Sequence, residues 1–241
     1  VASGATMPPR SRRCRSTASG PPVHSDEVLL QVVHEDAHLL VLHKPSGLLT
    51  IPGQSPTQLD CLITRARLRW PDALIVHRLD QATSGLLMLA RGPAMQKALS
   101  QAFEKRQIHK RYEAVVHGQP PVPTHADGWD EIDLPIRIDW HNRPRSIVDP
   151  VRGKPSRTRW QATGPGPWGD TTRLLLEPLT GRTHQLRLHL MALGHPIVGD
   201  PLYAEPPFQT LAQRLLLHAC SLHLTHPVTG EPLTLSLAAP F

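Results

Sequence analysis

The 241-residue sequence predicts an α+β fold built around a mostly antiparallel sheet. Three observations favour this class. Short apolar runs typical of strands outnumber the segments with helical periodicity, and no regular alternation of strand and helix runs along the chain. Proline, at 26 residues, frequently interrupts the connections between these runs. Residues 26–241 are predicted to form one domain without internal repeats.

The predicted strands are short and are separated by polar or glycine-containing turns. They are residues 28–33, 39–42, 74–76, 86–90, 112–116, 174–176, 221–226 and 232–237. The last two flank the turn PVTG and therefore predict a terminal hairpin. The segment GPGPWG (164–169) is expected to be a loop between strands.

Two segments show helical periodicity. In the first, apolar residues recur at i, i+3, i+4, i+7 and i+8 between Met95 and Phe103, which predicts an amphipathic helix. The second helix is expected to start near Thr183 and to stop at Gly194. Pro196 follows directly, a common signal for the C-terminal end of a helix.

Composition excludes several classes of protein. No apolar run approaches the ~18 to 20 residues of a transmembrane helix. The three cysteines lie far apart without a C-x-x-C pair, which excludes a disulfide scaffold and suits a reducing, cytoplasmic compartment.

The net charge of +6 is distributed unevenly. Residues 1–25 carry four arginines and no acid, and they predict a disordered basic arm that is dispensable for catalysis. Residues 26–241 carry 22 basic and 20 acidic side chains. An RNA ligand would therefore be bound through local basic patches.

Some motifs are weak on their own. HEDAH (34–38) matches the zinc-protease pattern H-E-x-x-H, which requires a helix, whereas its flanks predict strands joined by a turn. His218, His223 and His226 are interpreted as surface or hydrogen-bonded histidines rather than metal ligands. The sequence contains no G-x-G-x-x-G, P-loop or G-x-S-x-G motif, so neither a metal nor a nucleotide cofactor is predicted.

Three polar segments carry candidate chemistry. In VHRLDQATSGLLMLA (76–90), Asp80 lies in a polar loop between two apolar runs, two residues after Arg78. Spacing alone favours a turn-capping Asp80 that pairs with Arg78. In KRQIHKRYEAVV (105–116), four basic residues surround Tyr112.

The third segment is GRTHQLRLHLMALGHPIVGD (181–200). His184, Arg187 and Met191 are spaced to share one face of a helix, so the first two are candidates to enter a common site. Taken separately, each of the three segments fits an ordinary solvated surface better than a functional site.

Together, the segments resemble the motif set of the RluA-type pseudouridine synthases. HRLDQATSGLL (77–87) resembles the family's catalytic loop, KRYEAVVHG (110–118) its tyrosine motif, and residues 181–203 its arginine-bearing helix. KPSGLLTIPG (44–53) resembles the family's opening strand and turn. The resemblance covers 28–241 and implies a pseudouridine-synthase catalytic domain, whose mostly antiparallel central sheet is flanked by helices and loops.

This resemblance implies isomerisation of uridine to pseudouridine within RNA. Asp80 would act at the anomeric centre, either by attack on C1′ or by a glycal route near C2′. Arg187 would pair with Asp80, and Tyr112 would lie against the target base. No metal, nucleotide or redox cofactor is expected, because the product is an isomer of the substrate.

The target uridine has to be flipped out of its stack, and Arg78 is expected to fill the vacated space or to hold the displaced phosphate. The full set of expected RNA-binding residues is Lys44, His77, Arg78, Lys110, Arg111, Arg182, His184 and Leu186. Two phosphate-binding patches are expected. They comprise Lys105, Arg106, Lys110 and Arg111, and Arg152, Lys154, Arg157 and Arg159.

Substrate identity is implied by residues 133–158 and by the lack of an N-terminal S4-type domain in this sequence. Both features resemble those of the family branch that modifies uridine 32 in the tRNA anticodon stem-loop and uridine 746 in 23S rRNA. A single-substrate synthase, a catalytically silent RNA-remodelling protein and a metallohydrolase built on HEDAH are the alternatives. A monomer is expected, and no membrane partner.

Overall fold

The computed structural model describes residues 1, 30–53, 55, 58–121, 123 and 125–241. Within these residues the chain forms a ten-stranded, mostly antiparallel sheet, a separate two-stranded sheet and three helices. The predicted α+β class is confirmed. Apart from residue 1, the predicted basic arm lies outside the described residues. No described helix has the length and apolar character needed to cross a bilayer.

The helices are α1 (Leu62–Arg69), α2 (Pro93–Glu104) and α3 (Gln185–Ala192). The strands are β1 (Val32–Glu35), β2 (Leu39–Lys44), β3 (Ala73–Ile75), β4 (Ser84–Arg91), β5 (His109–His117), β6 (Asp130–Asp133), β7 (Ile136–Ile138), β8 (Ser146–Val148), β9 (Arg157–Pro165), β10 (Thr171–Pro178), β11 (Leu217–Thr225) and β12 (Pro232–Ser236).

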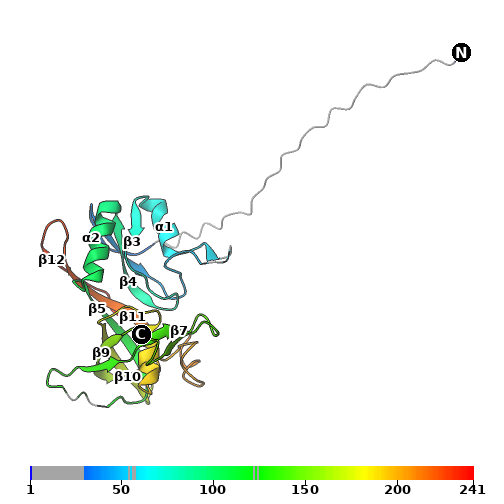
Figure 1. Cartoon of the computed structure of the whole chain (residues 1–241), viewed down its shortest axis with the longest axis vertical. Coiled ribbons are helices and arrows are strands. Elements are labelled where there is room, and N and C mark those ends of the chain that lie inside the picture. The colour runs from blue at the N-terminus through cyan, green and yellow to red at the C-terminus, as the bar shows by residue number, and fades with distance from the viewer. Residues whose placement is uncertain (2–29, 54, 56–57, 122, 124) are drawn as a thin grey trace.

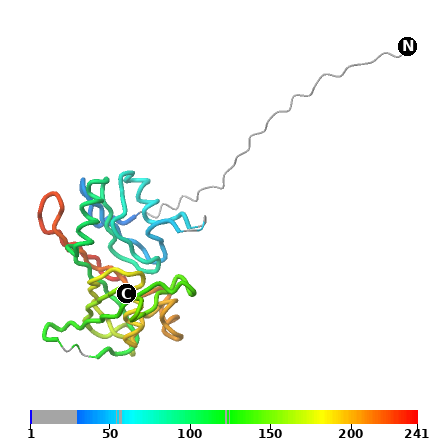
Figure 2. Tube along the Cα trace, viewed as in Figure 1, coloured from blue at the N-terminus to red at the C-terminus, as the bar shows by residue number. Residues whose placement is uncertain are grey.

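The large sheet has the strand order β1-β2-β4-β11-β5-β10-β9-β6, with β3 paired to β4 and β12 paired to β11. Figure 1 shows two halves: β1–β4 with α1 and α2 at the top, and β5, β9, β10 and α3 below. The halves meet where β4 lies beside β11, the one parallel pairing among the described strands. The C-terminus returns to this junction (Figure 2).

Gly85 makes the junction possible. A Cβ atom at this position would lie 2.3 Å from the carbonyl oxygen of Ala219 on β11, and the backbone has a φ of +117°. Both conditions require glycine. Since Gly85 is five residues after Asp80, the loop that carries this carboxylate ends at the contact between the halves.

β4 is buried on both faces, and its alternating residues belong to two cores. Leu86 and Met88 pack in a cluster with Met95 and Leu99 of α2. Leu87 and Leu89 belong to the larger cluster that includes α1 and continues through β5 and β10 into the lower half. The polar loop before β4 is therefore held by a rigid strand.

Most predicted elements are confirmed, with shifted ends. The first strand begins at Val32 rather than at residue 28, and residues 28–29 lie outside the described part. α3 begins at Gln185 instead of near Thr183, because His184 adopts a left-handed backbone with a φ of +57°. HEDAH spans the end of β1 and the turn before β2, as predicted, and does not form a helix.

Candidate active site

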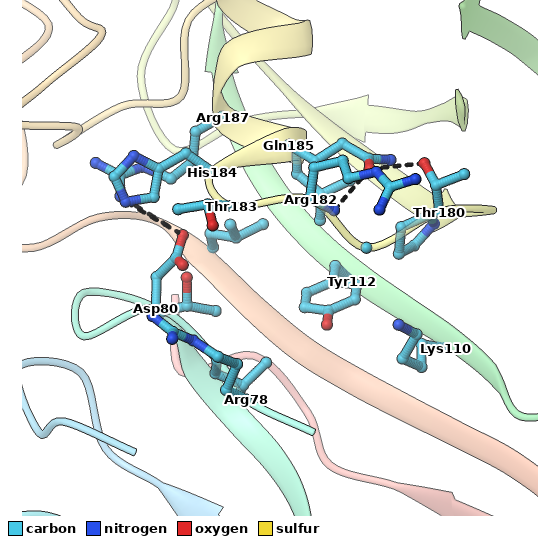
Figure 3. Close-up of a pocket in the computed structure, with 16 residues that line it drawn as sticks. Arg78, Asp80, Lys110, Tyr112, Thr180, Arg182, Thr183, His184, Gln185 and Arg187 are labelled. Carbon is cyan, nitrogen blue, oxygen red and sulfur yellow. Dashed lines mark hydrogen bonds and ion pairs between the residues drawn. The ribbon is translucent and has the colours of Figure 1, made fainter. Parts of the chain in front are cut away.

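A pocket with a cavity volume of about 130 Å³ lies where the two halves face each other (Figure 3). Its walls come from the loop before β4, from β5, and from the loop that leads into α3. The polar and charged residues that line it include Arg78, Asp80, Thr83, Lys110, Tyr112, Thr180, Arg182, Thr183, His184, Gln185 and Arg187. The fold thus brings together the three segments that spacing alone did not connect.

The carboxylate of Asp80 faces two cationic or ionisable groups. Its Oδ2 lies 3.6 Å from a terminal guanidinium nitrogen of Arg187 and 3.9 Å from Nε2 of His184. The Asp80 side chain retains 21% of its exposure, whereas Arg187 retains 3%. Asp80 is therefore accessible from the pocket while its partner is shielded from water.

Arg187 has a closer partner than Asp80. Its Nε and second terminal nitrogen donate to the two carboxylate oxygens of Asp200, each at 2.7 Å, and Asp200 is fully buried. A two-pronged arginine–carboxylate pair fixes the guanidinium plane. The expected ion pair with Asp80 is present, but Asp200 is what orients Arg187.

Side-chain groups of Thr50 and Lys44 hold the backbone of the loop on both sides of Asp80. The hydroxyl of Thr50 donates to the carbonyl of Leu79 at 2.8 Å and accepts the Leu79 N–H at 3.2 Å. On the other side, the ammonium of Lys44 donates to the carbonyl of Gln81 at 3.1 Å. The strand–turn segment that resembles the family's opening motif thus supports the loop that carries Asp80.

Lys44 was expected to contact RNA, and the structure places it elsewhere. It is fully buried, and its ammonium donates to the carbonyls of Pro45, Leu48 and Gln81 at 2.8 to 3.1 Å. Burial lowers the pKa of Lys44 to about 7, against the opposing influence of the Asp80 carboxylate. Its donors point into the protein, so this geometry gives Lys44 a positioning role.

Thr50→Val is expected to lower both activity and stability. Valine keeps the shape of threonine but leaves the buried N–H and C=O of Leu79 without the hydroxyl, which costs about 1 to 3 kcal/mol. Urea unfolding measures this loss. Because the backbone before Asp80 is released, kcat should fall by about tenfold or more, whereas KM for RNA should change little. An unchanged kcat would contradict the support role.

Tyr112 projects from β5 into the pocket, between Asp80 on one side and Lys110 on the other (Figure 3). It is 8% exposed, and burial together with the negative charge of Asp80 raises the pKa of its phenol, which stays protonated at neutral pH. Lys110, two residues earlier, lies on the same face of the strand. Burial lowers the pKa of Lys110.

Arg111 was grouped with Lys110 in the expected patch, yet it lies on the opposite face of β5. Its guanidinium is 5.5 Å from the ring centre of Trp129, outside the pocket lining. The second expected patch is also altered. Arg157 is paired with Glu131 at 2.6 Å, and Arg159 with Asp127 at 2.5 Å. These three arginines are occupied by protein groups.

A wider groove of about 670 Å³ adjoins the pocket and shares Arg78, Lys110 and Arg182 with it. Arg106 also lines this groove. Within the described part of the chain, the side chains of Arg78, Arg106 and Arg182 have no carboxylate partner. Unpaired arginines of this kind are available to phosphate groups.

His77 lines the groove but not the pocket. Its Nε2 accepts the N–H of Met88 at 2.9 Å, and its ring centre lies 4.8 Å from that of Phe103. Burial, with a smaller contribution from Lys110, lowers the pKa of His77 to about 3. A neutral ring that anchors β4 therefore stands where an RNA contact was expected.

This anchor predicts a dependence of stability on pH. An unfolded histidine takes up a proton near pH 6.5, whereas folded His77 stays neutral down to about pH 3. Between these values the unfolded state binds more protons, so the free energy of unfolding falls as the pH drops. His77→Gln keeps an acceptor for Met88 but does not titrate. Between about pH 7.5 and about pH 5.5 it should therefore lose about 1.4 kcal/mol less than the wild type.

Urea unfolding at the two pH values checks this expectation, with the exposed His125→Gln as the control. His125→Gln should retain the pH dependence of the wild type. If the free energy of unfolding of His77→Gln depended on pH as strongly as that of the wild type, His77 would take up a proton in the folded protein as readily as in the unfolded chain.

His184 and Gln185 shape the entrance to α3. His184 Nδ1 lies 3.0 Å from the hydroxyl of Tyr203, and burial lowers the pKa of His184 against the attraction of Asp80. The Gln185 amide oxygen accepts from the Thr180 hydroxyl and from the backbone N–H of Arg182. Leu186 lines the pocket as a buried apolar residue. The sequence reasoning assigned no role to Gln185 or Tyr203.

Among the residues that the structure describes, no cluster of three or more histidine, cysteine or acidic side chains is arranged to hold a metal ion. His34 of HEDAH is hydrogen-bonded to Asp36 at 2.7 Å.

Comparisons with known proteins identify the family of this chain. Residues 38–192 match the family model described as RNA pseudouridylate synthase. The chain is 40% identical to the dual-specificity RNA pseudouridine synthase RluA of Haemophilus influenzae and 42% identical to that of Escherichia coli strain K12. Each match covers 89% of this chain and 95% of the relative.

Solved structures show the same fold. Human RNA pseudouridylate synthase domain containing 1 superimposes with a TM-score of 0.71 at 31% identity, over 88% of this chain and 84% of that one. Human RNA pseudouridylate synthase domain containing 4 gives a TM-score of 0.64 at 25% identity, over 87% and 88%. By sequence and by fold, the chain belongs to the RNA pseudouridylate synthase family and is an RNA-modifying isomerase.

Proposed function

We propose that this enzyme has two substrates and converts uridine 32 of a tRNA anticodon stem-loop and uridine 746 of 23S rRNA to pseudouridine. The observation that carries the proposal is the extent of the likeness. Relatives named dual-specificity synthases match over 95% of their length. The match therefore includes residues 133–158, the segment that distinguishes this branch, as well as the catalytic motifs.

Asp80 is proposed as the group that acts at the sugar. The reaction has to break the bond from C1′ to N1 and form a bond from C1′ to C5, with oxocarbenium-like charge at the sugar. A carboxylate answers that charge, by attack on C1′ or by acting near C2′. Support comes from its accessibility to the pocket and from the buried Arg187 at 3.6 Å, which keeps a positive charge against it.

Tyr112 and Arg78 are proposed to handle the base and the space it leaves. The largely buried, protonated ring of Tyr112 provides a flat surface across the pocket from Asp80. Arg78 is exposed at the border between pocket and groove, two residues from the carboxylate. A flipped uridine costs a few kcal/mol of lost stacking, least in a loop, and an arginine at its vacated position offsets part of this cost.

Release of tritium from RNA labelled at C5 of uridine tests the proposal, because C5 loses its hydrogen when it bonds to C1′. We expect release from an anticodon stem-loop transcript and from a 23S rRNA fragment, and none when uridine 32 or 746 is replaced by cytidine. Release from one RNA alone would identify a single-substrate synthase. The absence of release from both would contradict the proposed substrates.

A further inference from the structure

The β7–β8 hairpin carries an exposed aromatic residue at its tip, defined here as residues 139–145. Trp140 is 64% exposed, whereas Trp70 and Trp160 are buried in the core. The hairpin projects from the lower half of the molecule (Figures 1 and 2). Little of the Trp140 indole is buried by the fold of its own chain, so most of its ring surface is available to a ligand.

The tip combines this ring with unpaired positive charge. The guanidinium of Arg143 lies 3.6 Å from the ring centre of Trp140, and that of Arg145 lies 5.4 Å from the ring centre of Tyr203. In the described part of the chain neither arginine has a carboxylate partner. The one acid of the tip, Asp139, accepts the backbone N–H groups of His141 and Asn142. The tip is thus cationic and held in shape by its own turn.

The base of the hairpin is attached to the wall of the pocket. The Ser146 hydroxyl donates to the carbonyl of Thr183 at 3.1 Å, and the Ser146 N–H donates to the hydroxyl of Tyr203 at 2.7 Å. That hydroxyl also contacts His184, which faces Asp80. The tip is therefore held in a fixed position relative to the reacting centre.

The tip is also within reach of the same RNA. Arg143 is three positions before Ser146, which limits their separation to about 10 Å. A stacked strand advances about 3.4 Å per nucleotide. Because Ser146 contacts Thr183 in the pocket wall, an RNA loop with its uridine in the pocket can reach the tip within a few nucleotides.

We propose that the hairpin tip is a second RNA-binding site, where Trp140 stacks on an unpaired base of the substrate loop and Arg143 contacts a neighbouring phosphate. The proposal rests on the proposed function, which supplies an RNA loop as substrate. Single-stranded bases stack on exposed aromatic rings without strong sequence preference. The positive charge and the single exposed ring favour RNA over an apolar protein surface, which would need a larger patch.

Kinetics on the anticodon stem-loop test the stacking. Trp140→Ala should raise KM by about tenfold, the effect expected from loss of one stacked base, with kcat changed by less than about twofold. Trp140→Phe keeps an aromatic face and should stay within about threefold of the wild type. Leu68→Ala, at an 86% exposed leucine of α1, is the control and should leave KM unchanged.

Salt dependence tests the phosphate contact. Arg143→Ala should reduce the slope of log K against log salt by about 0.7, the effect of one contact on a single strand. Arg69→Ala removes an arginine that also lies over a tryptophan, 4.5 Å from the ring centre of the buried Trp70, and should leave the slope unchanged.

A fluorescent 2-aminopurine placed along the loop reports stacking directly. Its emission should be quenched on binding to the wild type and to Trp140→Phe, and should remain higher with Trp140→Ala. Unchanged KM, slope and quenching in the variants, with an active wild type, would overturn the tip site and leave the proposed function intact. If the wild type releases no tritium, binding and quenching of the same RNA decide the tip separately.

Discussion

Asp80→Asn is expected to abolish pseudouridine formation while RNA binding is retained. Asparagine keeps the size of the side chain but cannot supply the negative charge that the sugar requires at the transition state. The loss should exceed about a thousandfold in kcat, or about 4 kcal/mol of transition-state stabilisation. Tritium release gives kcat, and fluorescence anisotropy of a labelled stem-loop gives the affinity.

The affinity should stay within about threefold, because the groove arginines and the tip do not depend on Asp80. Asp60→Asn is the matched control. It makes the same chemical change at an exposed carboxylate that is paired with Arg65 away from the pocket, and it should retain full turnover. Residual turnover of Asp80→Asn above about a tenth of the wild type would assign the sugar chemistry to another group.

The candidate catalytic residues were predicted from motif resemblance, and the fold explains why spacing alone was insufficient. Asp80, Tyr112 and Arg187 lie on different elements, and the β4–β11, β11–β5 and β5–β10 pairings bring them to one pocket. Asp200 is the last residue of the segment 181–200, but motif resemblance did not assign it a role. Its pairing with Arg187 depends on how the chain after α3 returns over the helix, which no local pattern encodes.

Strand alternation contained signals that the sequence reasoning did not use. Lys44 lies two and four residues after Leu42 and Leu40, and both leucines are core residues. Period-two alternation therefore places Lys44 on the buried face of β2. The same rule separates Arg111 from Tyr112 on β5. Lys44 and Arg111 were both predicted to contact RNA. Their positions along β2 and β5 determine which face of the sheet each side chain occupies.

The elements absent from the predictions, α1 and β6–β9, lack a long apolar run, although β9 is nine residues long. β6 has the sequence DEID, in which one residue is buried. α1 has the sequence LITRARLR, in which three residues are buried. Neither shows the apolar run that marked β2 and β4. Such elements are stabilised by their neighbours: β6 pairs with β9, and α1 packs through Leu62 and Ile63 on the core of the upper half.

Asp200→Asn is expected to produce the largest loss of stability. Asp200 is fully buried, and it also accepts the backbone N–H groups of Leu202 and Tyr203 through Oδ1. Asparagine can still accept those two bonds, but its Nδ2 replaces the oxygen that accepts from Arg187 Nε, so the change removes the charge and one hydrogen bond of the pair. Removal of one partner of a buried ion pair leaves the guanidinium of Arg187 uncompensated, which costs about 3 kcal/mol or more.

Urea unfolding measures this cost against Asp60→Asn, for which an exposed pair predicts a loss below about 1 kcal/mol. The double variant Arg187→Met with Asp200→Asn removes the uncompensated guanidinium, keeps an acceptor for the N–H groups of Leu202 and Tyr203, and should be more stable than Asp200→Asn. It should nevertheless lack activity, because the positive charge beside Asp80 is gone. Recovery of stability without recovery of turnover separates the two contributions of Arg187. If Asp200→Asn were as stable as the wild type, Asp80 at 3.6 Å would be a sufficient counterion for the buried arginine.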